Sequence, residues 1–313
     1  MTITLGQTVL RRPFPGPRIT ISHRMREVAI VGAGELGGLV AHALARRNAA
    51  DVIRLIDDSA NIAEGKALDI GQAAPVEGFA TVVSGSTGLS AAAGAGVVVI
   101  ADRAEQPGSS PNPERHYWHG EEALALIRQL NAIAPRAVFI CADVSHRELV
   151  ERSVRELHMS RSRILGSASE AFVAAATAIV ALEMDVSPRD VTISILGVPS
   201  DRIVIVWEDA AVAGFRLTGM ITEPVRRQLT RRIGALWPVG PYALAAAACK
   251  VVDSLSGHSR RPVTCFVAPD DQSGVRTRAA ALPVRLGADG IVEVVMPTLS
   301  GVERVALDNA MML

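Results

Sequence analysis

Short apolar runs alternate with longer alanine- and leucine-rich segments along the first half of the chain. The runs EVAIV, VIRLI, VVVIA and AVFICA begin at Glu27, Val52, Val97 and Ala137. Such unbroken apolar runs are typical of strands that are buried on both faces of a parallel sheet. The segments between them, such as 36–47, have the length and composition of helices. Strands that alternate with helices predict an α/β fold with a doubly wound, Rossmann-type parallel sheet.

The second half of the chain has a different pattern. Its helical segments are expected over 171–183, 224–236 and 242–255. Its strand-like runs lie at 191–196, 204–208, 263–268, 281–286 and 291–295. Helices beside antiparallel strands predict an α+β unit. A chain of 313 residues is long enough for two domains of about 150 residues each.

A glycine-rich turn, VGAGELG, directly follows the first predicted strand and precedes the first predicted helix. Gly32 would permit a tight turn, Gly34 would let a pyrophosphate approach the backbone, and Gly37 would let the helix pack on the strand. The N–H groups that begin the helix would face the phosphates. Asp57, at the end of the second strand, can accept hydrogen bonds from an adenosine ribose and would repel a 2′-phosphate, which favours NAD over NADP. The candidate cofactor-binding residues are Gly32, Gly34, Glu35, Leu36, Gly37 and Asp57.

Composition excludes several classes of function. The 32 acidic and 32 basic residues leave no formal net charge, so we expect neither a nucleic-acid partner nor a membrane-surface partner. No apolar run reaches the roughly 18 residues that cross a bilayer. The three cysteines are widely separated, which predicts no disulfide framework and no metal site and suits the cytoplasm. Residues 1–25 are expected to be a disordered tail or to precede the true start.

The glycine turn belongs to a much longer similarity. From Glu27 to about Asn309 the chain contains, in order, VGAGELGG, RLIDDSANIAEGKALDI, QPGSS, IVALEMDVSPRDVTISILG and LPVRLGADGIVEVVMPTLSGVER. This series resembles the lactate/malate dehydrogenase family, and malate dehydrogenases in particular. The resemblance implies a Rossmann-type NAD-binding domain over 26–147 and an α+β C-terminal domain over 148–313, whose first strand near 163–166 could return to the first sheet. It also implies NAD or another adenine nucleotide as ligand, and a homodimer or homotetramer as assembly.

The resemblance also implies where catalytic groups should stand. The family transfers a hydride between NAD and a 2-hydroxy acid, with a His–Asp pair for the hydroxyl proton and arginines for the carboxylate. This chain carries other residue types at those positions. They are Pro199 for the histidine, Phe172 for the aspartate, Ala175 for the helix arginine, Glu105 and Pro111 for the loop arginines, and Ala142 for the asparagine after the fourth strand.

These replacements remove the chemistry that the reaction needs. Proline and phenylalanine have no titratable group, and a glutamate repels a dicarboxylate substrate. We therefore expect none of the catalytic residues to be intact. A further departure is Asp102, which stands where the family has a glycine beside the dinucleotide. That carboxylate would disfavour a pyrophosphate unless Arg103 offsets it.

Three functions follow as alternatives. The first is a non-catalytic or repurposed family member that keeps the adenosine side of the NAD site. The second is an NAD-dependent malate dehydrogenase-type oxidoreductase with relocated catalytic residues, for which His116, His119 and His146 are candidates. The third is a structural or interaction protein that binds no nucleotide.

Overall fold

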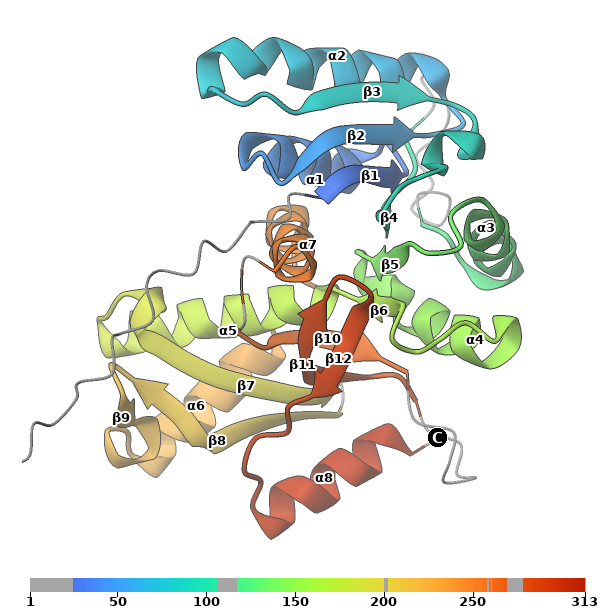
Figure 1. Ribbon diagram of the computed structural model, residues 1–313. Coiled ribbons are helices and arrows are strands. Elements are labelled where there is room, and N and C mark those ends of the chain that lie inside the picture. The colour runs from blue at the N-terminus through green and yellow to red at the C-terminus, as the bar shows by residue number, and fades with distance from the viewer. Residues whose placement is uncertain are drawn as a thin grey trace, which may run out of the picture.

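The fold is that of a computed structural model, which describes residues 25–105, 117–199, 202–257, 259, 261–268 and 278–312. Residues 1–24 lie outside this part of the chain, and so does most of the predicted N-terminal extension. Within the described residues, twelve strands form one sheet, with the order β3-β2-β1-β4-β5-β6-β10-β11-β7-β8-β9 and with β12 beside β11 (Figure 1). The predicted α/β class with a Rossmann-type parallel sheet is confirmed.

The first half of the sheet is entirely parallel. Its strand order reverses between β1 and β4, which places a crevice at the carboxyl ends of these two strands. The central strands β4 and β5 are fully buried, as their unbroken apolar sequences predict. The elements are β1 (Met25–Val31), α1 (Glu35–Arg46), β2 (Ala50–Ile56), α2 (Ala60–Glu77), β3 (Val82–Ser86), β4 (Val97–Ile100), α3 (Gly120–Ile133), β5 (Val138–Cys141), α4 (Arg147–Leu157) and β6 (Ile164–Gly166).

The second half continues the same sheet with antiparallel strands. The two halves join where Gly166 of β6 pairs with Phe266 of β10. A Cβ at Gly166 would lie only 2.9 Å from the Phe266 ring, so a glycine fits this junction. The elements are α5 (Ala168–Met184), β7 (Val191–Val198), β8 (Arg202–Val212), β9 (Phe215–Arg216), α6 (Glu223–Gly234), α7 (Pro241–Leu255), β10 (Val263–Val267), β11 (Ala280–Gly287), β12 (Gly290–Val294) and α8 (Gly301–Met311).

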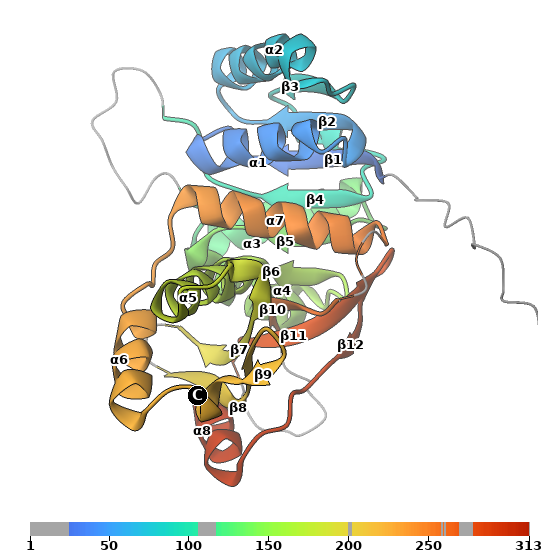
Figure 2. The same cartoon turned by 90° about the vertical axis from the view of Figure 1, so that its left-hand side faces the viewer.

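Helices cover both faces of the parallel half. In Figure 2, α1, α7 and α5 lie in front of the sheet and α3 and α4 lie behind it, and the buried apolar side chains form a separate core on each face. The front core is close-packed because α7 turns small residues such as Ala245 and Ala248 toward it. Within the described ranges, no helix combines the length and the apolar character that crossing a membrane requires.

Two elements differ from the sequence-based expectation. The edge strand β3 was not predicted, because Val82 is 60% exposed and the strand continues with serine and glycine. The sequence pattern predicts a helix over 60–70, whereas α2 continues to Glu77 and the left-handed Gly78 terminates it. Glycine at position 71 and proline at 75 mask this extension in the sequence.

The turn that follows β5 is held by a buried polar cluster. The Asp143 carboxylate accepts hydrogen bonds from the backbone N–H of Ser145 at 2.8 Å and from its hydroxyl at 2.7 Å. His146 is fully buried, and its Nδ1 accepts a long hydrogen bond from the Asp143 N–H at 3.4 Å. Burial lowers the pKa of His146 to about 4, while the Asp143 carboxylate opposes the shift and His119 adds to it.

The turn after β1 depends on a close approach of two glycines. Gly32 has a φ of +106°, a conformation that L side chains rarely adopt. A Cβ at Gly37 would lie 2.0 Å from the Gly32 carbonyl oxygen. The first turn of α1 can therefore sit directly against β1 only if residue 37 has no side chain.

Replacing Gly37 with alanine is expected to lower the free energy of unfolding by about 1–3 kcal/mol, because backbone atoms must move to admit the methyl group. Gly71→Ala is the matched control, since a Cβ there meets nothing within 4 Å among the described residues. That variant should gain about 0.5–1 kcal/mol, because alanine is the better helix former. Urea unfolding of both variants measures the difference, and equal stabilities would contradict the close-approach argument.

The buried imidazole predicts a specific loss of stability in mild acid. Because the pKa of His146 is about 4 in the folded protein and the ordinary pKa of histidine is about 6.5, the unfolded chain takes up a proton that the folded chain does not. Stability is therefore present above pH 6.5 and falls toward pH 4, by on the order of 3 kcal/mol. His146→Gln should flatten this part of the pH profile of unfolding. An unchanged profile would mean that His146 ionises freely in the folded protein.

Candidate functional site

A cavity of about 550 Å³ opens at the carboxyl edge of the parallel sheet, where the strand order reverses. Ligands of open α/β sheets bind at this kind of position. The walls come from the first turn of α1, from one face of α2, from the segment after β4 and from the segment before α3. The lining residues are Ala33, Gly34, Glu35, Ile62, Lys66, Asp102, Arg103, Ala104, Glu105 and Tyr117.

Asp102, directly after β4, binds the start of α1. Its Oδ2 accepts a hydrogen bond from the Leu36 N–H at 3.1 Å, and its Oδ1 accepts one from the Gly37 N–H at 2.9 Å. Its backbone carbonyl accepts a third from the Gly34 N–H at 2.9 Å. The helix N-terminus, which attracts negative charge, thus already has a carboxylate from the chain itself.

The Asp102 carboxylate is 9% exposed. Burial raises its pKa, while the hydrogen bonds from Gly37 and Leu36 and the positive charge of Lys66 act in the opposite direction. Lys66 reaches across from α2 and donates a hydrogen bond to the Gly34 carbonyl at 2.5 Å. Sequence reasoning did not single out Lys66, although it is one of the few lysines in the chain and lies on the helix that follows the predicted ribose carboxylate.

The second carboxylate at the turn, Asp57, follows β2 and is 7% exposed. Its Oδ2 accepts hydrogen bonds from the N–H groups of Ala33 at 2.8 Å and Ala104 at 2.9 Å, and its Oδ1 accepts one from Ser59 at 3.0 Å. Asp57 therefore ties the glycine turn to the segment after β4. Its Oδ1 accepts a single hydrogen bond among the described contacts and keeps capacity for another donor.

Arg103 does not supply the compensating charge that the sequence suggested for Asp102. Its guanidinium pairs with Glu122 and stacks on the Trp118 ring, with 3.6 Å between the guanidinium carbon and the ring centre. The cation that acts on the Asp102 carboxylate is Lys66. Arg103 lines the cavity, but its guanidinium is held by the acid of α3 and by the aromatic ring of the preceding segment.

Acidic groups dominate the wall around Tyr117. Burial raises the pKa of the Tyr117 phenol, and the nearby carboxylates of Asp143, Asp102 and Glu35 raise it further. Glu105 adds another carboxylate to the lining. The cavity lining thus carries three carboxylates together with two cations, Lys66 and Arg103.

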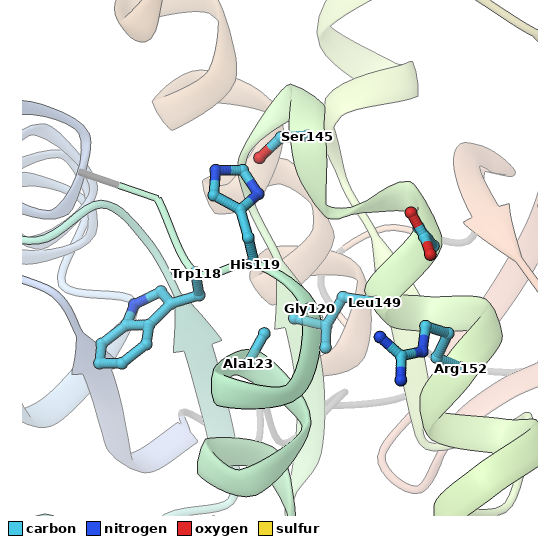
Figure 3. Close-up of a pocket in the computed structure, with 8 residues that line it drawn as sticks. Trp118, His119, Gly120, Ala123, Ser145, Leu149 and Arg152 are labelled. Carbon is cyan, nitrogen blue, oxygen red and sulfur yellow. The ribbon is translucent and has the colours of Figure 1, made fainter. Parts of the chain in front are cut away.

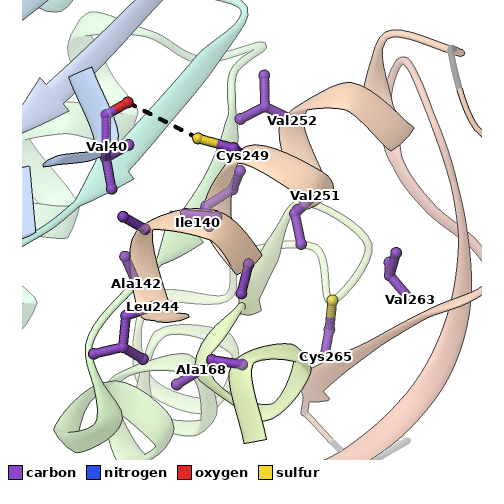
Figure 4. Close-up of a cluster of buried hydrophobic side chains, with 14 of the residues drawn as sticks. Val40, Ile140, Ala142, Ala168, Leu244, Cys249, Val251, Val252, Val263 and Cys265 are labelled. Carbon is purple, nitrogen blue, oxygen red and sulfur yellow. Dashed lines mark hydrogen bonds between the residues drawn. The ribbon is translucent and has the colours of Figure 1, made fainter. Parts of the chain in front are cut away.

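Apart from Glu105, which lines the cavity, the described positions at which the resemblance places catalytic groups carry apolar side chains. Phe172, on α5, is 1% exposed and contacts the Trp237 ring edge to face, with 5.7 Å between the ring centres. Trp237 in turn contacts Phe266 at 6.1 Å. Ala142 is buried in the front core together with Leu244 and Ala168 (Figure 4).

The remaining positions of the family's catalytic groups lie on or beside other parts of the fold. Ala175 lies on α5 and is half-buried, and Pro199 directly follows β7. Pro111 and His116 lie outside the described residues. The structure thus brings together the glycine turn, Asp57 and Asp102. The described positions at which the resemblance places catalytic groups do not contribute an acid–base pair to the cavity.

His119 lines a separate small hollow of about 40 Å³ between α3 and α4 (Figure 3). Trp118, Ser145 and Arg152 also line it. Arg152 forms ion pairs with Glu156 and Glu121. A volume of this size accommodates about one water molecule and no substrate.

Glu170, two residues before Phe172, has a structural role. Its carboxylate accepts a hydrogen bond from the Thr264 N–H at 2.7 Å and pairs with Lys250. It joins the first turn of α5 to β10 and α7, and it is 4% exposed. The contacts explain why an acid is buried here without facing the cavity.

Comparison with known proteins gives the context for this geometry. A sequence model of the family described as lactate/malate dehydrogenase, NAD binding domain, matches residues 26–116. The malate dehydrogenase of Thermomicrobium roseum is 29% identical over 293 residues, which cover 91% of this chain and 94% of that protein.

Solved structures agree on the fold. The malate dehydrogenase of Aeropyrum pernix superposes with a TM-score of 0.79 at 20% identity, covering 91% of this chain and 94% of that one. The lactate dehydrogenase of Cryptosporidium parvum, complexed with lactic acid and NAD, gives a TM-score of 0.78 at 23% identity, with 91% and 94% covered. Residues 26–116 thus match the NAD-binding domain of lactate/malate dehydrogenases, and the chain is similar to a malate dehydrogenase along about nine-tenths of its length.

Proposed function

We propose that this protein does not transfer hydride to or from 2-hydroxy acids and keeps a recognition site for the adenosine half of NAD. The observation that carries the proposal is the environment of Phe172. An aromatic side chain packed against Trp237 stands at the position that the resemblance assigns to the acid of the proton-transferring pair.

The chemistry of the reaction supports this proposal. Proton exchange with a hydroxyl group needs a titratable side chain, and such catalysis contributes about 10²–10⁴-fold to a rate. Pro199 and Phe172 cannot hold or move a proton. Ala175 cannot form the paired hydrogen bonds with which an arginine holds a carboxylate.

On the adenosine side of the site, the ribose position can still bind a ligand, whereas the phosphate position is occupied by Asp102. Asp57 Oδ1 can accept a further hydrogen bond from a ribose hydroxyl, and its charge disfavours a 2′-phosphate, so the proposed site takes an adenosine whose 2′-hydroxyl is free. The phosphate part of the site does not fit a pyrophosphate, because Asp102 already holds the Leu36 and Gly37 N–H groups. Two unit charges 4 Å apart repel by about 4 kcal/mol at an effective dielectric constant of 20.

A second candidate function is a structural or interaction role with no nucleotide bound. It is favoured by the same two carboxylates, since both already accept hydrogen bonds from the backbone of the glycine turn. We propose a homodimer or homotetramer for either function. Exposed Leu68 and Val76 on α2 and Leu182 on α5 support an interface through these helices.

We also propose a cytoplasmic location. Cys141, Cys249 and Cys265 are free and buried. Burial raises the pKa of Cys141 and Cys249 to about 12. Such thiols stay protonated and unreactive, which suits a reducing compartment.

The non-catalytic proposal predicts that NADH is not consumed when the protein is mixed with oxaloacetate or pyruvate. Absorbance at the nicotinamide band measures this directly, and a lactate/malate dehydrogenase with the intact His–Asp pair serves as the positive control. Turnover above the rate without protein that disappears on heat denaturation would overturn the proposal.

The adenosine proposal predicts that Asp57→Asn weakens adenosine binding by about tenfold or more, because a hydrogen bond to a charged acceptor is lost. Asp58→Asn removes the neighbouring, exposed carboxylate and should leave the affinity unchanged. Calorimetric titration with adenosine compares the three proteins. Equal affinity in all three would exclude Asp57 as the ribose acceptor.

A further inference from the structure

The Asp102 carboxylate sits at the point where the fold would receive a phosphate. It accepts hydrogen bonds from the N–H groups of Leu36 and Gly37 in the first turn of α1. It also lies against Gly34, where an added Cβ would be 2.3 Å from Asp102 Oδ2. The glycine that would let a phosphate approach the backbone is thus covered by a side chain of the same protein.

The interaction is long-range and specific. Asp102 lies 66 residues from Leu36 in sequence, whereas the residue that directly precedes α1 is Gly34, which has no side chain to cap the helix. Lys66 closes the arrangement from α2, since it donates to the Gly34 carbonyl and its charge acts on Asp102. The anion, its two N–H donors and a neighbouring cation form a complete set of partners without a ligand.

We infer that Asp102 is a built-in substitute for the ligand phosphate, and that the site therefore selects unphosphorylated nucleosides over ADP and NAD. A phosphate could reach the Leu36 and Gly37 N–H groups only if the Asp102 carboxylate left them. Elsewhere in the wall the carboxylates of Glu35 and Glu105 stand beside the cations Lys66 and Arg103. The nucleoside part of this inference rests on the proposed function, whereas the exclusion of phosphate rests on Asp102 alone.

The test is a gain of binding. Asp102→Gly frees the Leu36 and Gly37 N–H groups, and Asp102→Asn keeps the shape of the side chain while removing its charge. Asp58→Asn is the matched control, because it removes an exposed negative charge beside Asp57 and leaves the cavity lining unchanged. Circular dichroism and thermal unfolding verify that each variant is folded before titration with adenosine, ADP and NAD.

We expect the wild-type protein to bind adenosine at least about tenfold more tightly than ADP or NAD. Asp102→Gly should bind ADP and NAD at least about tenfold more tightly than the wild type does, with Asp102→Asn in between and Asp58→Asn close to the wild type. In ¹⁵N spectra, ADP should shift the amide signals of Leu36 and Gly37 in Asp102→Gly and leave them in place in the wild type.

Two results would contradict the inference in different ways. If the wild type binds ADP or NAD as tightly as adenosine, and Asp102→Gly does not raise the affinity for ADP or NAD, then Asp102 does not exclude phosphate. The proposed recognition of the adenosine half would still hold in that case. If Asp102→Gly gains ADP binding while adenosine binds to neither protein, the exclusion holds and the proposed nucleoside site fails. If Asp58→Asn matches the gain of Asp102→Gly, the effect is general electrostatics and the substitution of phosphate by Asp102 is refuted.

Discussion

The first turn of α1 directs unpaired N–H groups toward the carboxyl edge of the sheet, and negative charge has to be placed against them. In this protein the charge comes from Asp102, two positions after Ile100, the last residue of β4. The same carboxylate fixes the glycine turn to the centre of the sheet, and Asp57 fixes the other side of the turn to Ala104. The geometry of the edge, from β1 to β4, therefore depends on two buried acids of the chain itself.

In this protein the architecture of a dinucleotide-binding domain is not accompanied by the side chains that such a domain would be expected to place around its ligand. The glycine turn and the parallel sheet match an NAD-binding domain, and the similarity to a malate dehydrogenase extends along most of the chain. The side chains around the cavity differ from those that a dinucleotide and its reaction need. Carboxylates line the cavity beside the glycine turn, and Phe172 packs against an aromatic ring. A scaffold can thus persist while its site is filled by other side chains, since packing and chemistry place separate demands on the sequence.

The sequence predicts the parallel half well because its strands are unbroken apolar runs and its first turn requires glycine. It misses β3, an exposed edge strand whose neighbours supply the hydrogen bonds, and the end of α2, where Pro75 suggests a break. Asp102 could be recognised as an unusual acid near a phosphate position. Its contact with Leu36 could not, because that requires knowing that the end of β4 lies beside the start of α1. The roles inferred for Pro199, Phe172 and Ala175 stay predictions from the resemblance.

The central claim is that the chain's own carboxylate occupies the phosphate position. A crystal structure of the wild-type protein grown with a saturating concentration of NAD tests it most directly. The account predicts Asp102 within hydrogen-bond distance of the Leu36 and Gly37 N–H groups, and no phosphate density on them. A pyrophosphate bound to those N–H groups, with the Asp102 side chain turned away, would contradict it.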